Sequence, residues 1–277
     1  MAWDGVAEAY RWSFATLCRG AVPALLEATA PAVSHLDVGC GTGDLALAAA
    51  RAGRRVVAAD PEPDMVALTR RTVEADGAGV SVVGAGAPGL PLPDAVFDAV
   101  TANFVVNHVP EPRATIAELA RVATPGGRLA MTIWPAEPGP HLAAYGQAAR
   151  NAGAVPVAST RLPPELDFPR TPHGLADLAR GAGLRVESAE EITWTWHITA
   201  DDLMAGIAGG VATPGQTHRA QKPEVRAAIE RRARELWSAY ATDGGGGVAD
   251  APGISCATLA FPVSAVLVSA VVPVETA

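Results

Sequence analysis

Three glycines directly after a short apolar segment constrain the fold of this chain more than any other feature. They are Gly39, Gly41 and Gly43, and they follow residues 34–38, which are typical of a buried strand. Glycines at this spacing let the backbone turn tightly and let a ligand approach the main chain without meeting a Cβ atom. The Ala- and Leu-rich segment 45–52 then predicts a helix whose N-terminal N–H groups face that ligand.

The same alternation of strands and helices continues along the chain. Strands are expected over 34–38, 55–59, 80–83, 97–102, 128–134, 185–195 and 255–272. Helices are expected over 1–30, 45–52, 64–75, 113–122, 141–151 and 174–181, with two helical stretches within 200–240, the second over 223–240. Strands separated by helices predict right-handed βαβ units. We therefore expect an α/β fold with a Rossmann-like, doubly wound, mostly parallel seven-stranded sheet.

Charge and composition disfavour several classes of function. The formal net charge is −8 and the arginines form no basic stripe, so nucleic acid is an unexpected partner. The three cysteines are far apart, and no His or Cys spacing is typical of a metal site. No signal peptide is evident, and the apolar run near 263–274 is too short to cross a bilayer. We expect a soluble cytoplasmic protein without metal or membrane partner, either monomer or homodimer.

A dinucleotide site is the alternative interpretation of the glycine turn. Its fingerprint is G-x-G-x-x-G. Counting from Gly39 puts Asp44 at the sixth position, and counting from Gly41 puts Ala46 there. An aspartate in the first helical turn also repels a pyrophosphate and suits a ligand that has positive charge and no phosphate. The sequence therefore disfavours a nicotinamide oxidoreductase.

The string D-V-G-C-G-T-G at 37–43 resembles the glycine motif of class I S-adenosylmethionine-dependent methyltransferases. In that family the motif follows the first strand and contacts the amino-acid end of the cofactor. The resemblance therefore implies that Asp37, Gly39, Gly41 and Gly43 bind S-adenosyl-L-methionine, which methyl transfer converts to S-adenosyl-L-homocysteine.

Three further residues match cofactor-binding positions of the family. Asp60 ends the second expected strand, where a carboxylate can accept hydrogen bonds from both ribose hydroxyls. From the residues alone, Asp60 can also be a helix N-cap. Met65 matches an apolar residue that packs on adenine, and Tyr10 matches an N-terminal aromatic that closes over the cofactor, although an aromatic on an apolar helix face is usually core.

The stretch after the third strand departs from the family pattern. Related sequences place an aspartate there that hydrogen-bonds the adenine amino group, whereas the Leu90-Pro91 register puts Gly86 at that position. The lost charge-assisted hydrogen bond is worth about 1.5–3 kcal/mol. We expect weaker cofactor binding, with adenine held by backbone contacts near Ala87.

The fourth strand and its neighbours return to the pattern. Asn103 and Phe104 lie at the expected carboxyl end of that strand, where doubly wound sheets place their ligands, and are assigned to the cofactor site. The strings 108–112 and 125–129 are similar to family strings. The resemblance covers about residues 1–135, which we assign as the cofactor-binding half of a single methyltransferase domain over 1–277.

Two histidines are candidates for a general base, which is needed only if the acceptor keeps its proton. They are His108, after the fourth strand, and His141, after the fifth. An imidazole with a pKa near 6.5 suits deprotonation of a phenol or an amine. The alternatives are that His108 orients a loop and that His141 is an exposed helix start.

Segment 196–250 is expected to be an insertion that caps the substrate. Its apolar residues Trp196, Met204 and Trp237, together with Trp134, are the candidates for an acceptor pocket. The alternative is that they pack the cap and the core. Within the segment, the four glycines 244–247 predict a flexible connector.

These observations favour methyl transfer to an oxygen, nitrogen or carbon atom of a small, aromatic or polycyclic molecule. A place in secondary metabolism follows only by analogy of fold. Two alternatives stay open. One is an enzyme of the same fold that binds the cofactor or its product and catalyses a cyclisation or rearrangement, which the missing acid at Gly86 motivates. The other is a non-catalytic binding protein.

Overall fold

The computed structural model describes residue 3 and residues 5–157, 162–242 and 257–274. The chain divides into two units. Unit 1 comprises Met1–Leu17, Glu137–Thr160 and Thr193–Val263, and unit 2 comprises Cys18–Ala136, Arg161–Ile192 and Ser264–Ala277. The expected cap segment 196–250 falls within unit 1, which also takes in the N-terminus and the segment after the fifth strand.

The sheet has the seven strands that the sequence predicts. They are β1 (Ser34–Val38), β2 (Arg55–Asp60), β3 (Val80–Gly84), β4 (Phe97–Asn103), β5 (Ala123–Ile133), β6 (Arg185–Thr199) and β7 (Thr258–Val271). Their order is β3-β2-β1-β4-β5-β7-β6. The neighbours from β3 to β5 are parallel, and β7 runs antiparallel to β5. The expected Rossmann-like, mostly parallel sheet is confirmed.

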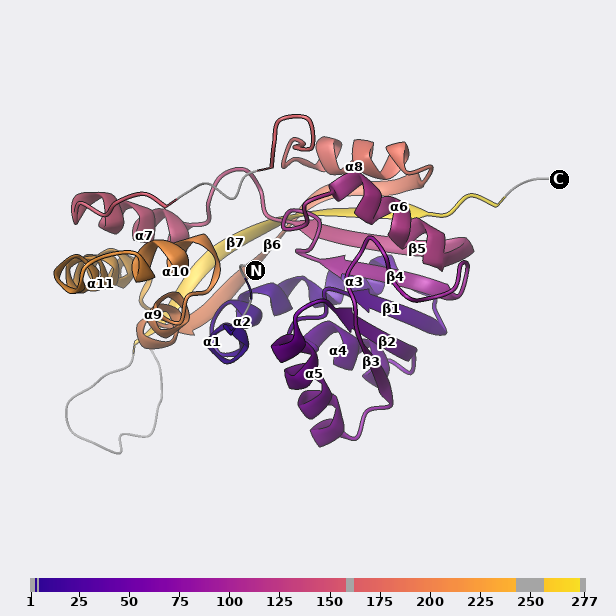
Figure 1. Ribbon diagram of the computed structural model, residues 1–277, viewed down its shortest axis with the longest axis horizontal. Helices are drawn as coiled ribbons and strands as arrows, with labels where there is room; N and C mark the ends of the chain where they lie inside the picture. The colour runs from indigo at the N-terminus through magenta and orange to yellow at the C-terminus, as the bar shows by residue number, and fades with distance from the viewer. Residues whose placement is uncertain (1–2, 4, 158–161, 243–256, 275–277) are drawn as a thin grey trace. The chain divides into compact units, whose positions relative to one another are not determined.

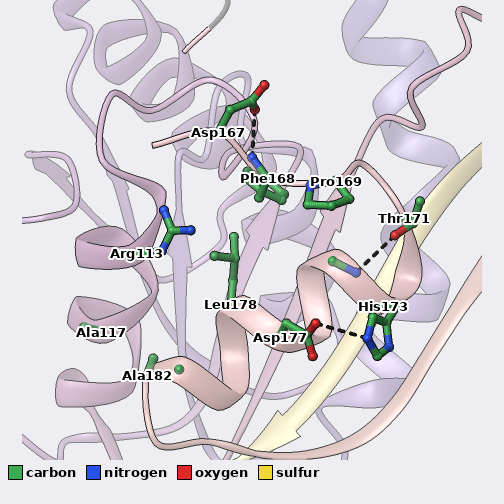
Figure 2. Close-up of a pocket in the computed structure, with 12 residues that line it drawn as sticks. Arg113, Ala117, Asp167, Phe168, Pro169, Thr171, His173, Asp177, Leu178 and Ala182 are labelled. Atoms are coloured by element: carbon green, nitrogen blue, oxygen red, sulfur yellow. Dashed lines mark hydrogen bonds and ion pairs between the residues drawn. The ribbon is translucent and has the colours of Figure 1, made fainter. Parts of the chain in front are cut away.

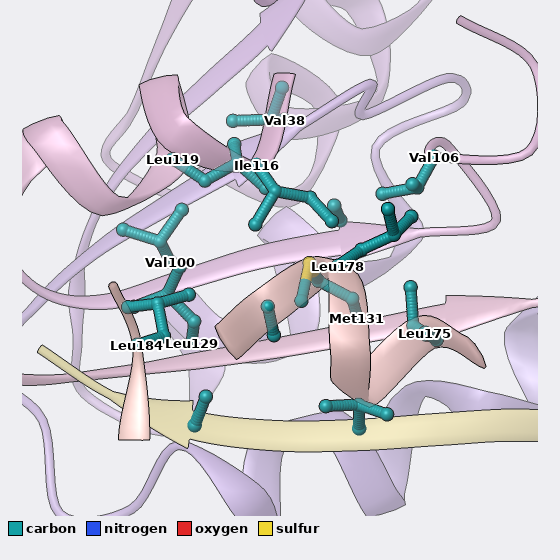
Figure 3. Close-up of a cluster of buried hydrophobic side chains, with 14 of the residues drawn as sticks. Val38, Val100, Val106, Ile116, Leu119, Leu129, Met131, Leu175, Leu178 and Leu184 are labelled. Atoms are coloured by element: carbon teal, nitrogen blue, oxygen red, sulfur yellow. The ribbon is translucent and has the colours of Figure 1, made fainter. Parts of the chain in front are cut away.

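Helices cover both faces of the sheet in unit 2 (Figure 1). On one side lie α3 (Val22–Ala28), α4 (Asp44–Arg51) and α5 (Pro63–Asp76), and on the other lie α6 (Pro112–Val122) and α8 (Pro172–Gly181). A large apolar cluster fills the space between the sheet and the helices α6 and α8 (Figure 3). It joins Ile116 and Leu119 of α6 and Leu175 of α8 to strand residues such as Val100 and Met131. Each such side chain contributes about 1.5–3 kcal/mol when fully buried.

Alternation along β1 separates the two faces chemically. Leu36 and Val38 join the cluster under α6 and α8. His35 and Asp37 point the opposite way, because successive strand residues face opposite sides of a sheet. Both are fully buried polar residues on the side of α3 to α5. The strand that leads into the glycine turn therefore carries polar groups on this face.

In the first half of the chain, two expected elements differ from the structure. The helical segment expected over 1–30 is broken into α1 (Ala7–Arg11), α2 (Phe14–Cys18), a 3₁₀ turn (Arg19–Ala21) and α3. The strand expected from residue 128 begins at residue 123, because Ala123 already pairs with Phe97 across a register shift in β4. Both differences concern boundaries, which local propensity sets poorly.

Unit 1 is mainly helical. Besides α1 and most of α2 it contains α7 (Pro140–Asn151), α9 (Ala200–Ala208), α10 (Ala212–Arg219), α11 (Pro223–Trp237) and a 3₁₀ turn (Ser238–Tyr240). Three helices therefore replace the two expected within 200–240, because Gly210 takes a φ of +89° and ends the first. The glycines 244–247 lie outside the described residues. Among the described helices, none has the length and apolarity needed to cross a membrane.

Candidate functional site

The glycine turn after β1 has a left-handed backbone, which favours glycine. Gly39, Gly41 and Gly43 have φ angles of +68°, +54° and +85°. A Cβ atom at Gly39 would lie 2.4 Å from Cγ2 of Val105, and one at Gly43 would lie 2.9 Å from Cγ2 of Thr69. The turn is thus a surface of bare main chain at the N-terminus of α4, as expected for close approach of a ligand.

Asp60 holds this turn from the end of β2. Its Oδ2 accepts a hydrogen bond from the backbone N–H of Gly41 at 2.9 Å, and its Oδ1 accepts one from the N–H of Glu62 at 3.0 Å. The side chain is buried, and burial raises the pKa of its carboxyl above the ordinary value. Glu62, and not Asp60, is the N-cap of α5. Because each carboxylate oxygen has two lone pairs, Asp60 retains acceptor capacity for a ligand.

Thr69 also holds the glycine turn, although its sequence context gave no sign of it. Its Oγ1 donates to the carbonyl of Gly41 at 2.7 Å, and its methyl group is the atom that a side chain at Gly43 would meet. A threonine in the middle of an amphipathic helix is ordinarily a neutral surface choice. Only the packing of α5 against the turn reveals its function.

Asp37 provides an unsatisfied acceptor beside the turn. Its side chain is 1% exposed, its Oδ1 accepts from Oγ1 of Thr101 at 3.3 Å, and its Oδ2 has no hydrogen-bond partner among the described residues. Burial raises the pKa of this carboxyl to about 7, and the nearby Asp60 carboxylate adds to the effect. A buried acceptor left without a donor costs about 1–3 kcal/mol, so the site fits a ligand that brings a donor or a positive charge.

Arg19 is a second site residue that the sequence did not reveal. Its guanidinium forms an ion pair with Asp44 at 2.8 Å, at the first turn of α4. The pair offsets the negative charge of Asp44, so in the folded protein this aspartate repels a pyrophosphate less than its position in the sequence suggests. The exclusion of a dinucleotide then depends on the failed glycine spacing.

The position of the missing acid is crowded by Pro61. A Cβ atom at Gly86 would lie 3.1 Å from Cβ of Pro61, so any side chain requires a small shift of the proline. The carbonyl of Ala87 already accepts a hydrogen bond from Thr115 at 3.2 Å. Met65 is 3% exposed and belongs to the buried face of α5. The assignments of Ala87 and Met65 to the adenine site stay predictions.

We expect Gly86→Asp to bind S-adenosylmethionine about tenfold more tightly than Gly86→Ala, because only the aspartate supplies an acceptor for the adenine amino group. Both variants carry the same Cβ atom, so they share the displacement of Pro61. Titration calorimetry of the two variants measures the difference. Equal affinities would show that adenine does not lie near residue 86.

Phe104 and Trp134 stack at the carboxyl ends of β4 and β5. Their ring centroids are 3.7 Å apart, with planes inclined by 10°. Phe104 has a φ of +56°, which is uncommon for a residue with a large side chain and is found mainly where the surroundings enforce it. Its N–H is fixed by Thr132, through the carbonyl at 3.1 Å and Oγ1 at 3.0 Å. The structure thus brings a cofactor candidate and an acceptor-pocket candidate together.

Asn103 is fixed on both sides of its amide. Its Oδ1 accepts from Oγ1 of Thr132 at 2.7 Å, and its Nδ2 donates to the carbonyl of Cys18 at 3.1 Å. It therefore anchors the end of β4 to the N-terminal segment of unit 2. A contact of Asn103 with the cofactor stays a prediction.

His108 lies on the loop after β4 with an exposed side chain. Its Nε2 lies 3.0 Å from Nδ2 of Asn107, so Nε2 accepts and the proton resides on Nδ1. Restricted hydration of the ring and the positive charge of Arg170 lower the pKa of the imidazole below its ordinary value. His108 is thus a neutral, accessible imidazole beside the strand ends of unit 2.

His141 has a different environment, in unit 1. It is 3% exposed, packs against the rings of Trp196 and Phe261, and has no partner for either ring nitrogen among the described residues. Burial lowers the pKa of the imidazole to about 4. The expectation of an exposed helix start was therefore wrong, because the ring turns into the aromatic core. The assignment of His141 as a base stays a prediction.

The remaining candidates also belong to unit 1. Trp196, Met204 and Trp237 are at most 3% exposed. Trp196 donates to Oγ1 of Thr16 at 2.8 Å, and Trp237 donates to the carbonyl of His141 at 3.0 Å. Tyr10 is half-buried and meets the ring of Trp3 edge-on at 5.5 Å. These contacts are structural, and the acceptor and cofactor assignments of these residues stay predictions.

A pocket of about 390 Å³ lies between α6 and α8 in unit 2 (Figure 2). Arg113 and Leu178 line it from the two helices, and Phe168 lines it from the segment that precedes α8. At its edge, Nε2 of His173 lies 3.1 Å from Oδ2 of Asp177. None of the residues that the sequence singled out lines this pocket, which is separate from the glycine turn.

Comparison with known proteins supports the resemblance. Residues 36–131 match the family model described as a methyltransferase domain. The demethylmenaquinone methyltransferase of Deinococcus radiodurans is 34% identical over 182 residues, which are 57% of this chain and 72% of that protein. The demethylmenaquinone methyltransferase of Thermus thermophilus is 44% identical over 105 residues, which are 37% of this chain and 48% of that protein. The chain thus spans about half the length of this second relative.

A solved structure shows the same fold over nearly the whole chain. It is the crystal structure of a proposed methyltransferase from Bacillus halodurans, which is 19% identical and has a TM-score of 0.56. The match covers 92% of this chain and 100% of that one. At this identity, the likeness concerns the fold alone.

Proposed function

Because this chain belongs to the class I S-adenosylmethionine-dependent methyltransferase family, we propose that it transfers a methyl group from S-adenosylmethionine to a small molecule. The acceptor atom is an oxygen, nitrogen or carbon of an aromatic or polycyclic compound. The observation that carries this proposal is the glycine turn, whose bare main chain follows the buried Asp37 and is hydrogen-bonded by the buried carboxyl of Asp60.

The residues of the turn fit the cofactor chemically. The main chain of Gly39, Gly41 and Gly43 would receive its amino-acid end, and the free acceptor capacity of Asp60 would receive its ribose hydroxyls. The unpartnered Oδ2 of Asp37 favours a cationic ligand. When bound, the cofactor supplies an electrophilic methyl group on a positively charged sulfur. What remains for the protein is alignment of the acceptor, which contributes up to about 7–11 kcal/mol in favourable cases.

The stacked rings of Phe104 and Trp134 support an aromatic acceptor. They lie at the ends of β4 and β5 in the same unit as the glycine turn. Offset stacking on such a pair contributes about 0.5–1.5 kcal/mol beyond the area buried. Two relatives are named demethylmenaquinone methyltransferases. We propose a hydroxylated aromatic acceptor, and its place in secondary metabolism stays a prediction.

We expect His108→Asn to lower kcat by about 10²–10⁴-fold if His108 is the general base. Because its pKa lies below the ordinary value, the neutral base is present from pH 8 down to at least pH 6.5, and the rate should not fall over that range on its account. The affinity for S-adenosylmethionine should change less than about twofold, since Asp60 and the turn are intact.

The matched control is His173→Asn, which changes an exposed histidine that pairs with Asp177. It should leave kcat unchanged. A His108→Asn enzyme with wild-type kcat would support the alternative that His108 only orients its loop. Measuring kcat requires an acceptor that the enzyme methylates, which the next experiment identifies.

The test of the proposed function is transfer of labelled methyl from S-adenosylmethionine to a panel of demethylmenaquinone, simple phenols and aromatic amines. It is preceded by calorimetric titration with S-adenosylmethionine and S-adenosylhomocysteine. Binding followed by transfer supports the proposal. Binding with conversion of an acceptor but without transfer of label would instead indicate cyclisation or rearrangement. No binding of either ligand would leave a non-catalytic partner protein.

A further inference from the structure

A buried chain of hydrogen bonds connects Arg54 to Asp37. Nη1 of Arg54 lies 2.9 Å from Nδ1 of His35, whose Nε2 lies 2.8 Å from Oγ1 of Thr101. Oγ1 of Thr101 in turn lies 3.3 Å from Oδ1 of Asp37. His35 and Asp37 project from the same face of β1, and Thr101 is the residue of β4 paired with Asp37. His35 and Thr101 are completely buried.

The first donor fixes the direction of the whole chain. A guanidinium only donates, so Nδ1 of His35 must accept and the ring proton must reside on Nε2. Nε2 then donates to Thr101, whose own hydrogen is shared between Asp37 and the carbonyl of Leu36 at 3.4 Å. Burial and the charge of Arg54 lower the pKa of His35 to about 3, which keeps this ring neutral and supports the same arrangement.

Arg54 is held in place from the other side. Its Nη1 donates to Oγ1 of Thr29 at 2.8 Å, and its Nη2 donates to the carbonyl of Leu26 at 2.7 Å. These contacts tie the guanidinium to α3 and to the residue that follows it. The start of the chain of hydrogen bonds is therefore a fixed donor.

The series of hydrogen bonds ends at the carboxyl of Asp37, which has one side-chain donor, Thr101. The titratable or charged groups around Asp37 come from several elements: His35, Cys40, Asp44 with its partner Arg19, and Asp60. Burial opposes ionisation, and so do its two carboxylate neighbours, whereas the hydrogen bond from Thr101 and the backbone N–H of Ala46 favour the ionised form. The charge of Asp37 therefore depends in part on the donor that Arg54 and His35 orient.

We propose that Arg54, His35 and Thr101 are positioning residues that orient a hydrogen bond onto Asp37 and favour its ionised form, and that binding of a cationic cofactor completes the ionisation by expelling the proton that remains on this carboxyl. None of the three needs to touch the cofactor. The inference rests on the proposed function, because the positive charge that draws the proton off is that of S-adenosylmethionine.

The sign of the pH dependence follows from this linkage. In the free protein the pKa of Asp37 is raised to about 7, so the carboxyl is increasingly protonated as the pH falls below that value. A cationic ligand binds the ionised form better. Affinity should therefore fall up to about tenfold for each pH unit below the pKa and level off above it. Up to one proton should be released for each ligand bound below pH 7.

The experiment is calorimetric titration of S-adenosylmethionine between pH 5.5 and 8.5, in buffers of different ionisation enthalpy. We compare wild type with Thr101→Val, which removes the hydroxyl at nearly constant volume, and Thr101→Ser, which restores it. Thr101→Val should move the pH midpoint up by about half to one unit and weaken binding at pH 6.5 by about three- to tenfold. Thr101→Ser should keep the wild-type midpoint. Asp37→Asn should abolish the proton release and leave only titration of the ligand's own amine.

Arg54→Leu tests the direction of donation along these hydrogen bonds without altering a fully buried residue. Arg54→Lys restores a donor at the same position. In wild type and Arg54→Lys, ¹⁵N chemical shifts of His35 should show the proton on Nε2. In Arg54→Leu, Nδ1 should gain the proton in part, and the pH midpoint should rise as in Thr101→Val. The ¹⁵N chemical shifts are measured without cofactor, so they test the hydrogen-bond direction even if the proposed function is wrong.

The outcomes separate the two proposals. If wild type binds no S-adenosylmethionine at any pH, the proposed function fails whatever the tautomer of His35. The other contradicting result is a wild type that binds, with Thr101→Val and Arg54→Leu variants that keep its pH midpoint of binding and its proton release. The hydrogen bonds from Arg54 to Asp37 would then have a purely structural role, and the inference would be wrong.

Discussion

Asp60→Ala should bind S-adenosylmethionine at least tenfold more weakly than wild type, a loss of about 1.4 kcal/mol or more. Two causes act together. The variant lacks the carboxylate that would accept the ribose hydroxyls, and it leaves the N–H groups of Gly41 and Glu62 without their acceptor. Titration calorimetry with S-adenosylmethionine and S-adenosylhomocysteine measures the effect.

The control for charge alone is Asp64→Ala, because Asp64 is the carboxylate on α5 that raises the pKa of Asp60. It should change binding less than about twofold. The two causes separate with an S-adenosylhomocysteine analogue that lacks the ribose 2′-hydroxyl. If Asp60 contacts the ribose, its removal should affect this analogue less than the parent ligand. An equal loss for both ligands would assign Asp60 to the support of the turn only, and unchanged binding in Asp60→Ala would contradict its place in the site.

The sequence predicted the sheet well because its signals are local. Each strand from β1 to β4 was expected within a residue or two of its observed bounds, since a short apolar run between turn-forming residues is typical of a buried strand. The glycine turn was equally clear, because three alternating glycines at a strand end favour a left-handed backbone, which all three adopt. Boundaries failed where tertiary pairing extended an element, as Ala123 shows in β5.

The side chains that support the site were not predictable in the same way. Thr69, Arg19 and Thr101 each act through a partner that is distant in the sequence, and each is an ordinary residue in its own segment. The one signal that the sequence does carry is polarity inside an apolar strand. His35 and Thr101 both interrupt buried strands, and such residues are buried only when they are hydrogen-bonded. The alternative of an exposed His141 was wrong because helical periodicity does not show which face a first-turn residue takes.

Gly39→Ala should abolish measurable cofactor binding and lower the free energy of unfolding by about 2–5 kcal/mol. A left-handed φ costs about 1–2 kcal/mol for a residue with a Cβ atom, and overpacking against Val105 adds about 1–3 kcal/mol. The second contribution arises because the new Cβ atom would lie 2.4 Å from Cγ2 of Val105. Relief of that clash displaces the turn, which moves the N–H groups that would receive the ligand. Urea unfolding followed by circular dichroism gives the stability, and calorimetry gives the binding.

The matched control is Gly77→Ala. Gly77 has a φ of +71°, close to the +68° of Gly39, but a Cβ atom there would meet nothing within 4 Å. It should lose only the backbone contribution, about 1–2 kcal/mol, and keep wild-type binding. The double variant Gly39→Ala/Val105→Ala removes the clash and retains the strained backbone, so it should recover part of the binding. If Gly39→Ala loses no more stability than Gly77→Ala and still binds the cofactor, close approach of the ligand to the main chain at Gly39 is not required.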